Sequence, residues 1–216
     1  LTLHDGRKIA LRGKIDRIDR WEGDEGVYLL VSDYKSSHRD IDPTRLWYGL
    51  QLQLLLYLQA ACEGLDGNPA DVKESAEKAI AKKLHLKGIV LADVDVVEAL
   101  DSNPGYSFTK IFNADSSVAS SSDGYTSEEM AALLAHAKKM AAELADRIRS
   151  GEITPSPAVI RDWNACQWCD CAGVCKLDTS IPGHEKRELP PLKKQDLLTL
   201  MANDTDAPGN EEDTSP

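Results

Sequence analysis

Three charged residues near the start of the chain have the types and spacing needed to bind a divalent cation. Asp33 and Lys35, in "SDYKSS", lie two apart at the end of an apolar run, so on a strand both side chains project from the same face. Asp16, in "GKIDRID", precedes this run, and hairpin pairing could bring it next to Asp33. Two carboxylates beside an ammonium group suit a Mg2+ that keeps several waters, with the lysine helping to position or deprotonate an attacking water. Ordinary strand residues joined by salt bridges would give the same pattern.

A second polar pair follows in the segment "GLQLQLLLY". Gln53 and Tyr57 are four residues apart and therefore share a face if the segment is helical. An amide and a phenol beside a metal site can hydrogen-bond phosphate oxygens or stack against an unpaired base. The spacing alone equally fits the polar edge of an amphipathic helix. Gln51 also precedes Tyr57, but at a different spacing, and is the weaker candidate.

The cysteines form a separate group. Cys166, Cys169, Cys171 and Cys175 fall within ten residues in "NACQWCDCAGVC", and the only other cysteine is Cys62. Short spacings in a chain without a secretory signal favour metal binding over disulfides. Because four thiolates can form a compact site, the residues alone favour zinc. Cys62 lies in or just after an apolar segment and is interpreted as a small buried hydrophobe.

The elements that must position these residues follow from the apolar patterns. Residues 8–35 are expected to form a β-hairpin with "KIALRGKI" as its first strand, "WEGDEG" as its turn and "VYLLVSDYK" as a central strand covered on both faces. The remaining expectations are a single buried helix over 44–62, an exposed helix or insertion over 71–83, a strand in "LKGIVLAD", a short helix capped by Asp93, a polar loop over 113–124, a long helix that begins with a Thr126–Glu129 capping box and stops at Gly151, and a short helix near 193–201.

Charge and hydropathy narrow the class of protein. The formal net charge of -11 weighs against nucleic-acid binding, but residues 1–60 carry nine basic and nine acidic side chains, and the last sixteen residues carry five acids. A neutral N-terminal part can still bind DNA locally. No apolar run approaches the roughly 20 residues of a membrane span, so we expect an intracellular protein without a membrane partner. We expect one domain over 1–180, ending in the cysteine segment 163–178, and an acidic, Pro-containing, largely disordered tail over 181–216.

The motifs "GKIDRID", "VSDYKSS" and "GLQLQLLLY" resemble those of the RecB-like nucleases, a branch of the PD-(D/E)xK superfamily. The resemblance implies an α/β, restriction-endonuclease-like core with a central mixed β-sheet flanked by helices, and Mg2+-dependent cleavage of DNA. By matching position it also implies roles for individual residues: Asp16 and Asp33 as metal ligands together with the backbone carbonyl of Tyr34, Lys35 as the catalytic lysine, and Gln53 with Tyr57 as the Q-x-x-x-Y element.

The cysteine spacing is similar to that of the iron-sulfur members of the same branch. Cys166-x2-Cys169-x5-Cys175, followed by "KLD", matches their C-terminal pattern. The resemblance implies a 4Fe-4S cluster on these three cysteines, with the fourth cysteine and the family's N-terminal helix upstream of Leu1. It therefore replaces zinc as the favoured metal. Cys171 is outside the pattern and receives no role.

Two further segments, "LHLKGIVLADVDVVEALD" and "IRSGEITPSP", are similar to the nuclease subunits of AddAB-type helicase-nucleases. This implies a cytoplasmic bacterial exonuclease domain that hydrolyses unwound single-stranded DNA in double-strand-break repair and recombination. It also implies an AddA-type partner with the ATP-driven motor, in keeping with the absence of a G-x-x-x-x-G-K-[ST] motif from this sequence. The alternatives are a non-catalytic DNA-binding clamp stapled by an iron-sulfur cluster and a zinc-binding interaction module; the joint presence of Asp16, Asp33 and Lys35 argues against the clamp.

Overall fold

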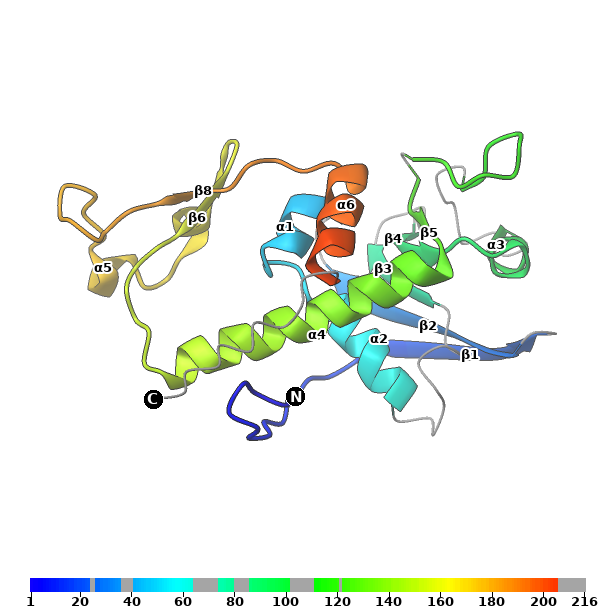
Figure 1. The fold of residues 1–216 in the computed structure, drawn as a ribbon, viewed down its shortest axis with the longest axis horizontal. Coiled ribbons are helices and arrows are strands. Elements are labelled where there is room, and N and C mark those ends of the chain that lie inside the picture. Colours follow the sequence, from blue (N-terminus) through cyan, green and yellow to red (C-terminus); the bar gives the residue numbers. More distant parts are fainter. Residues whose placement is uncertain are drawn as a thin grey trace, which may run out of the picture.

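A five-stranded mixed sheet with the strand order β1-β2-β3-β4-β5 forms the centre of the molecule (Figure 1). The structure is a computed structural model, and it describes residues 1–23, 26–35, 41–63, 74–79, 86–101, 111–120 and 122–205. The strands are β1 (Arg17–Gly23), β2 (Gly26–Lys35), β3 (Glu74–Ala79), β4 (Leu86–Leu91) and β5 (Gly124–Tyr125). The pairs β1-β2 and β3-β4 are antiparallel, whereas β2-β3 and β4-β5 are parallel. The sheet is therefore mixed, as predicted.

The central strand β2 is buried along its length. Every residue from 28 to 33 is buried, which matches the continuous apolar run in the sequence. Helix α2 (Gln53–Glu63) packs against β2, and its Leu55 and Leu58 are almost completely inaccessible to solvent. Fully burying a leucine side chain contributes about 1.5–3 kcal/mol, so this helix is firmly held against the strand.

The first strand is shorter than the sequence predicts. β1 begins at Arg17, whereas the expected strand began near residue 8. The first nine residues instead form a turn of their own, in which the Ile9 N–H donates to the Leu1 carbonyl at 2.9 Å. Leu11, expected on the buried face of that strand, is 54% exposed. The prediction was wrong here because local hydrogen bonds in residues 1–9 replace pairing with β2.

The expected single helix over 44–62 is two helices. α1 (Pro43–Trp47) ends before Gly49, and α2 starts at Gln53. Gly49 has φ +73°, a left-handed conformation that glycine adopts without the steric cost of a Cβ, and it ends α1. The apolar run continues across the break, so its periodicity gave no sign of this turn.

The segment expected as an exposed helix or insertion over 71–83 contributes a strand. β3 pairs with β2 on one side and with β4 on the other. Its sequence, "ESAEKA", has little strand propensity, so the pairing on both sides outweighs the local preference. The rest of 71–83 lies outside the described residues.

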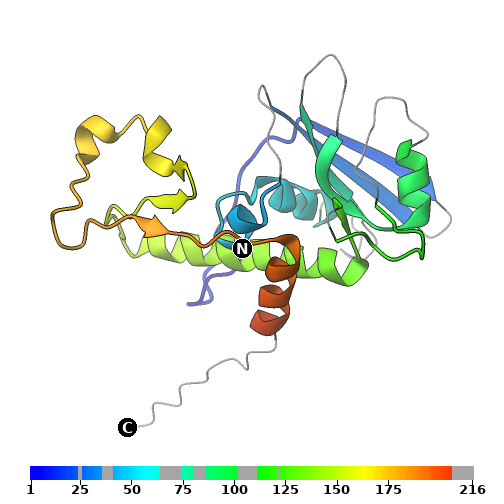
Figure 2. The ribbon, with the colours of Figure 1, turned by 90° about the horizontal axis from the view of Figure 1, so that it is seen from above.

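Two helix starts follow the expected capping. α4 (Ser127–Arg149) begins with a complete capping box, in which the Glu129 N–H donates to Thr126 Oγ1 at 3.2 Å and the Thr126 N–H donates to Glu129 Oε2 at 2.9 Å. α3 (Val94–Asp101) begins after Asp93, whose side chain accepts from the Val96 N–H at 3.4 Å. α4 runs past both the main sheet and a smaller lobe (Figure 2).

The part expected as a disordered tail includes folded structure. α6 (Lys194–Thr205) packs against α1 and α4 and buries Leu197 and Met201 in the main core. Lys194 donates to the Gly124 carbonyl and lies 4.1 Å from the centre of the Tyr125 ring; burial lowers the pKa of Lys194 and raises that of Tyr125. Residues 206–216 lie outside the described part of the chain. The predicted disorder is therefore wrong for α6, because two buried apolar residues anchor this helix.

The smaller lobe carries the cysteines (Figure 1). It consists of a three-stranded sheet of order β7-β6-β8, together with a 3-10 turn and one short helix. Its core is three buried residues, against which Tyr48 and Trp163 pack. Its elements are β6 (Ala158–Ile160), β7 (Trp163–Asn164), the 3-10 turn Ala165–Trp168, α5 (Ala172–Cys175) and β8 (Arg187–Glu188).

Among the described residues, no helix has the length and apolar character required to cross a membrane.

Candidate functional site

The strand register brings the two predicted carboxylates to adjacent positions. Arg17 of β1 pairs with Ser32 of β2, so the next residue on each strand, Asp16 and Asp33, would continue the same antiparallel ladder. Opposite residues in such a ladder have Cα atoms about 5 Å apart. Asp33 is 7% exposed and Asp16 is exposed. One carboxylate is therefore anchored in the core, while its neighbour faces solvent.

Lys35 lies two residues beyond Asp33 at the end of β2. Side chains alternate along a strand, so these two positions share a face of the sheet. The structure describes the backbone of Tyr34 and Lys35, and their side chains lie outside the described part. The paired positions in β3 are Glu77 for Asp33 and Ala79 for Lys35. Nothing in the sequence singled out Glu77, because the pairing that places it beside Asp33 is between segments distant in the chain.

Gln53 and Tyr57 lie together on the first turns of α2, as their spacing predicts. The Gln53 side-chain amide donates to the Tyr57 hydroxyl at 3.0 Å. Gln51 lies before the helix, and its side-chain carbonyl accepts from the Asp42 N–H at 3.0 Å, so it serves the turn ahead of α1. The geometry agrees with the preference for Gln53 over Gln51.

A contact that the sequence did not reveal connects this helix to the segment before Asp16. A Cβ on Gly13 would lie 2.7 Å from Cε1 of Tyr57, so only a glycine lets the ring approach the backbone this closely. Gly13 and Ile15 line the same cleft as Gln53 and Tyr57, with a volume of about 840 Å³. The aromatic side chain is thus placed next to the chain that leads into the carboxylate pair.

We expect Gly13→Ala to lower the free energy of unfolding by roughly 1–3 kcal/mol, because the added methyl must displace the Tyr57 ring. The measurement is urea unfolding of the single variants and of the double variant with Tyr57→Leu. If the cost arises at this contact, most of it disappears in the Tyr57→Leu background. Gly173→Ala is the matched control, since nothing lies within 4 Å of a Cβ at that position. An equal cost in both backgrounds would contradict the contact.

The carboxylates suit a hard cation. Mg2+ is commonly held through one or two carboxylates, with waters and substrate phosphates completing its octahedron. Asp16 and Asp33 supply such a pair. No group of three or more His, Cys, Asp or Glu side chains able to hold a metal occurs in the described residues. The donor set therefore fits a water-rich Mg2+ site and does not form an all-protein metal cage.

The four clustered cysteines are all exposed thiols. Cys166 and Cys169 lie in and just after the 3-10 turn, where the Cys166 N–H donates to the Asn164 side chain at 2.9 Å, while Cys171 caps α5 and Cys175 ends it. The thiols are the right donors for zinc or for an iron-sulfur cluster. In the described geometry they are not gathered into one ligand group. Cys62 is fully buried in the main core, as predicted.

The cysteine lobe is joined to the helices near the carboxylate site. The Arg45 guanidinium of α1 lies 4.7 Å from the centre of the Trp163 ring, and Tyr48 packs on the small core of the lobe. The Leu192 N–H donates to Thr44 Oγ1 at 2.9 Å. The lobe is thus fastened to α1, which is connected to α2 through the turn at Gly49.

The mixed sheet, the flanking helices and the acidic pair at the end of a buried strand agree with a comparison against known protein families. The sequence model of the PD-(D/E)XK nuclease superfamily matches residues 2–176. The chain belongs to this superfamily, and the predicted family resemblance is confirmed.

Individual relatives make the kinship narrower, and each is named as the B-type subunit of an ATP-dependent helicase/deoxyribonuclease. The chain is 33% identical, over 93% of its length, to the relative from Clostridium tetani (strain Massachusetts / E88), of which it covers 20%. It is 29% identical over 99% of its length to the relative from Thermoanaerobacter sp. (strain X514), of which it covers 21%. For the relative from Clostridioides difficile (strain 630) the identity is 28%, over 94% of this chain and 20% of the relative. The chain therefore spans about a fifth of the length of these relatives.

Proposed function

We propose that this chain is the DNA-cleaving module of a helicase-nuclease subunit, and that it hydrolyses phosphodiester bonds of unwound single-stranded DNA with Mg2+. The observation that carries the proposal is the register that sets Asp16 opposite the buried Asp33 at the end of β2. Membership of a nuclease superfamily and the names of the relatives support the same activity.

In this proposal Asp16 and Asp33 hold the cation, together with the backbone carbonyl of Tyr34. When bound, Mg2+ would offset negative charge on the scissile phosphate and lower the pKa of a water. Lys35 would orient the attacking water and stabilise the charge that develops on the phosphate. Burial of Asp33 keeps its position fixed, and a fixed ligand costs no reorganisation during the reaction.

Gln53 and Tyr57 are proposed to hold the DNA beside this site. Their mutual hydrogen bond orients the amide and the phenol together, so that either can contact a phosphate or base. The partner is proposed to be an A-type subunit with a helicase motor, because the relatives are named as the B-type component of an ATP-dependent helicase/deoxyribonuclease. That motor would deliver the single strand.

Cys166, Cys169 and Cys175 are proposed to ligate a 4Fe-4S cluster, whose fourth ligand comes from outside the described residues. The exposure of all three thiols leaves them accessible to such a ligand. A cluster would supply the small lobe with a covalent staple that its three-residue core lacks.

The test of the proposed activity is hydrolysis of end-labelled single-stranded DNA by the full-length protein. With Mg2+ we expect release of short nucleotides, and with EDTA in place of Mg2+ we expect the rate to fall to background, since the two carboxylates cannot replace the cation's charge. Readdition of Mg2+ should restore the rate. Metal-independent hydrolysis, or none under either condition, would contradict the proposal.

A further inference from the structure

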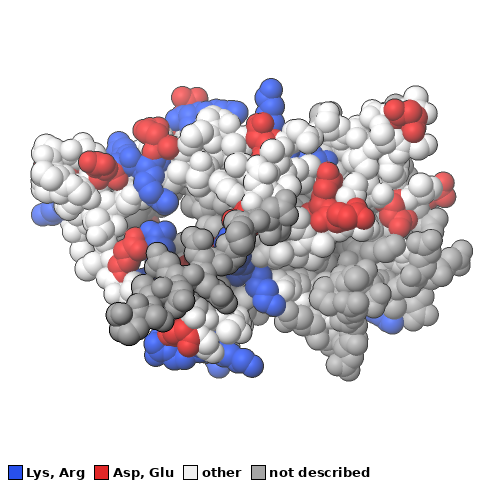
Figure 3. Space-filling view, in the orientation of Figure 1, with Lys and Arg blue, Asp and Glu red and all other residues white. Residues whose placement is uncertain are grey.

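The cleft beside Gln53 and Tyr57 is positively charged, although the chain as a whole has a formal net charge of -11. Its walls include Lys8, Arg12 and Lys138, and no Asp or Glu is found among the described residues that line it. Elsewhere, on the face seen in Figure 3, acidic and basic side chains are interspersed. A cavity of one sign concentrates ions of the opposite sign. The cleft is therefore suited to an anionic occupant.

The cations come from opposite sides of the cleft. Lys8 and Arg12 lie on the segment before β1, and Lys138 lies on α4. Between them, the α2 wall presents Gln53 and Tyr57 together with aliphatic side chains. Cationic walls around an aromatic and partly apolar surface match a polymer of alternating phosphates and flat bases.

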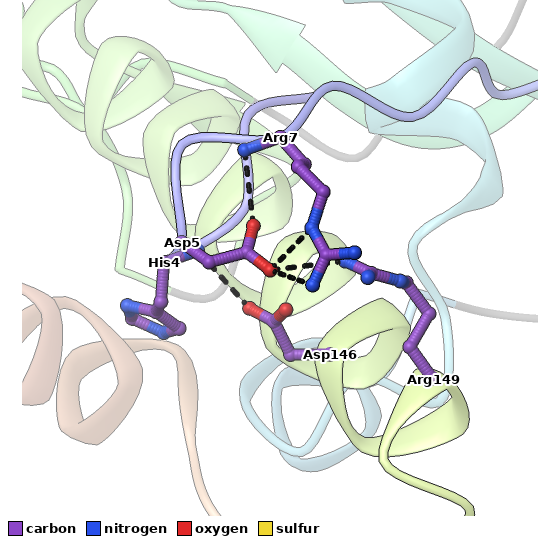
Figure 4. Close-up of polar contacts among 5 residues, drawn as sticks. All are labelled: His4, Asp5, Arg7, Asp146 and Arg149. Carbon is purple, nitrogen blue, oxygen red and sulfur yellow. Dashed lines mark hydrogen bonds and ion pairs between the residues drawn. The ribbon is translucent and has the colours of Figure 1, made fainter.

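The N-terminal wall is anchored before any ligand arrives (Figure 4). The His4 N–H donates to the Asp146 carboxylate of α4 at 3.2 Å, and Arg149 reaches the Asp5 carboxylate at 3.3 Å. The Arg7 side chain also donates to Asp5, and mainly for that reason the pKa of Asp5 is lowered to about 2. Because Asp5 remains ionised down to that pH, the anchor persists at neutral pH, and a preformed cleft costs less ordering on binding.

The cleft opens toward the carboxylate pair. Gly13 and Ile15 line it, and Asp16 is the next residue of the chain. A strand lying in the cleft would thus have its backbone led toward the proposed Mg2+ site. We propose that the cleft is the track of a single-stranded DNA substrate, with Arg12 and Lys138 contacting its phosphates from the two walls. This inference rests on the proposed function, because it gives the substrate a path to that site.

The test measures binding of a fluorescent oligothymidylate to the full-length protein by anisotropy at several salt concentrations. An Asp33→Asn background keeps the DNA intact. We expect Arg12→Gln and Lys138→Gln each to weaken binding and to reduce the slope of log K against log salt by about 0.7, the value for one phosphate contact on a single strand. Lys139→Gln is the matched control, because Lys139 is the next residue of α4 but pairs with Asp204 at 2.7 Å and is absent from the cleft lining. It should leave the slope unchanged.

Two readouts separate the possible outcomes. In protein that retains Asp33, the Arg12 and Lys138 variants should raise KM with little change in kcat, and the oligonucleotide should protect Lys138 from acetylation. Unchanged salt slopes, or a Lys138 that resists acetylation even without DNA because another protein segment covers the cleft, would overturn the track. Failure of the proposed function looks different: hydrolysis is absent, while the wild-type protein still binds DNA with a salt slope that these variants reduce.

Discussion

Asp33→Asn is expected to abolish Mg2+-dependent cleavage of single-stranded DNA while leaving the protein folded. Asn has nearly the shape of Asp but lacks the negative charge that a Mg2+ ligand at this position must supply. We expect kcat to fall by roughly 1,000-fold or more, similar to the loss of a group that stabilises charge in a transition state. The measurement is hydrolysis of end-labelled single-stranded DNA over a range of Mg2+ concentrations.

Stability should not explain this loss. Asp33 is 7% exposed, and replacing a buried carboxylate with a neutral amide removes a desolvated charge, so the free energy of unfolding should stay the same or rise. Asp19→Asn is the matched control: Asp19 lies on the same hairpin, pairs with Arg17 at 2.8 Å, and is opposite Leu30. The control should retain activity. If Asp33→Asn cleaved DNA at the wild-type rate, the catalytic assignment would fail and a non-catalytic DNA-binding clamp would be favoured.

Replacing Cys166, Cys169 and Cys175 together with serine is expected to remove iron from the protein and to unfold the cysteine lobe. The lobe has only three buried core residues of its own, and so small a core depends on additional staples. Anaerobically purified wild-type protein should contain iron and sulfide and absorb visible light, whereas the triple variant should be colourless. Limited proteolysis should then cut within the lobe, between 152 and 189, while the main sheet remains protected.

Cys171→Ser provides the control for this experiment. Cys171 lies outside the three-cysteine pattern, so the variant should keep its iron and its colour. Loss of iron in Cys171→Ser would make Cys171 a ligand and contradict the expected cluster geometry. Stoichiometric zinc without iron in the wild-type protein would contradict the cluster altogether and favour a zinc-binding module.

The elements predicted correctly are those specified by nearby residues. The apolar run of β2, the capping box of α4 and the Asp93 cap of α3 each depend on contacts within one strand or one helical turn. The joint position of Gln53 and Tyr57 likewise follows from the helical repeat alone. Such signals are present in any short window of the sequence, which is why they could be recognised there.

The elements predicted wrongly depend on partners that lie far away in the chain. β3 is a strand because β2 and β4 pair with it, and α6 is ordered because Leu197 and Met201 reach the main core. The first strand was placed too early because residues 1–9 close a turn on themselves and dock on α4. In each case tertiary contacts outweigh a weak local preference.

The same division applies to the site. Sequence alone established the chemical types of the site, two carboxylates with a lysine, an amide with a phenol, and four thiols in one segment. Only the tertiary structure decided that Asp16 continues the ladder opposite Asp33, that Tyr57 packs on Gly13, and that Lys138 faces the N-terminal wall of the same cleft. The physical reason is that side-chain chemistry belongs to each residue, whereas proximity arises from strand register and helix packing between segments that the chain separates.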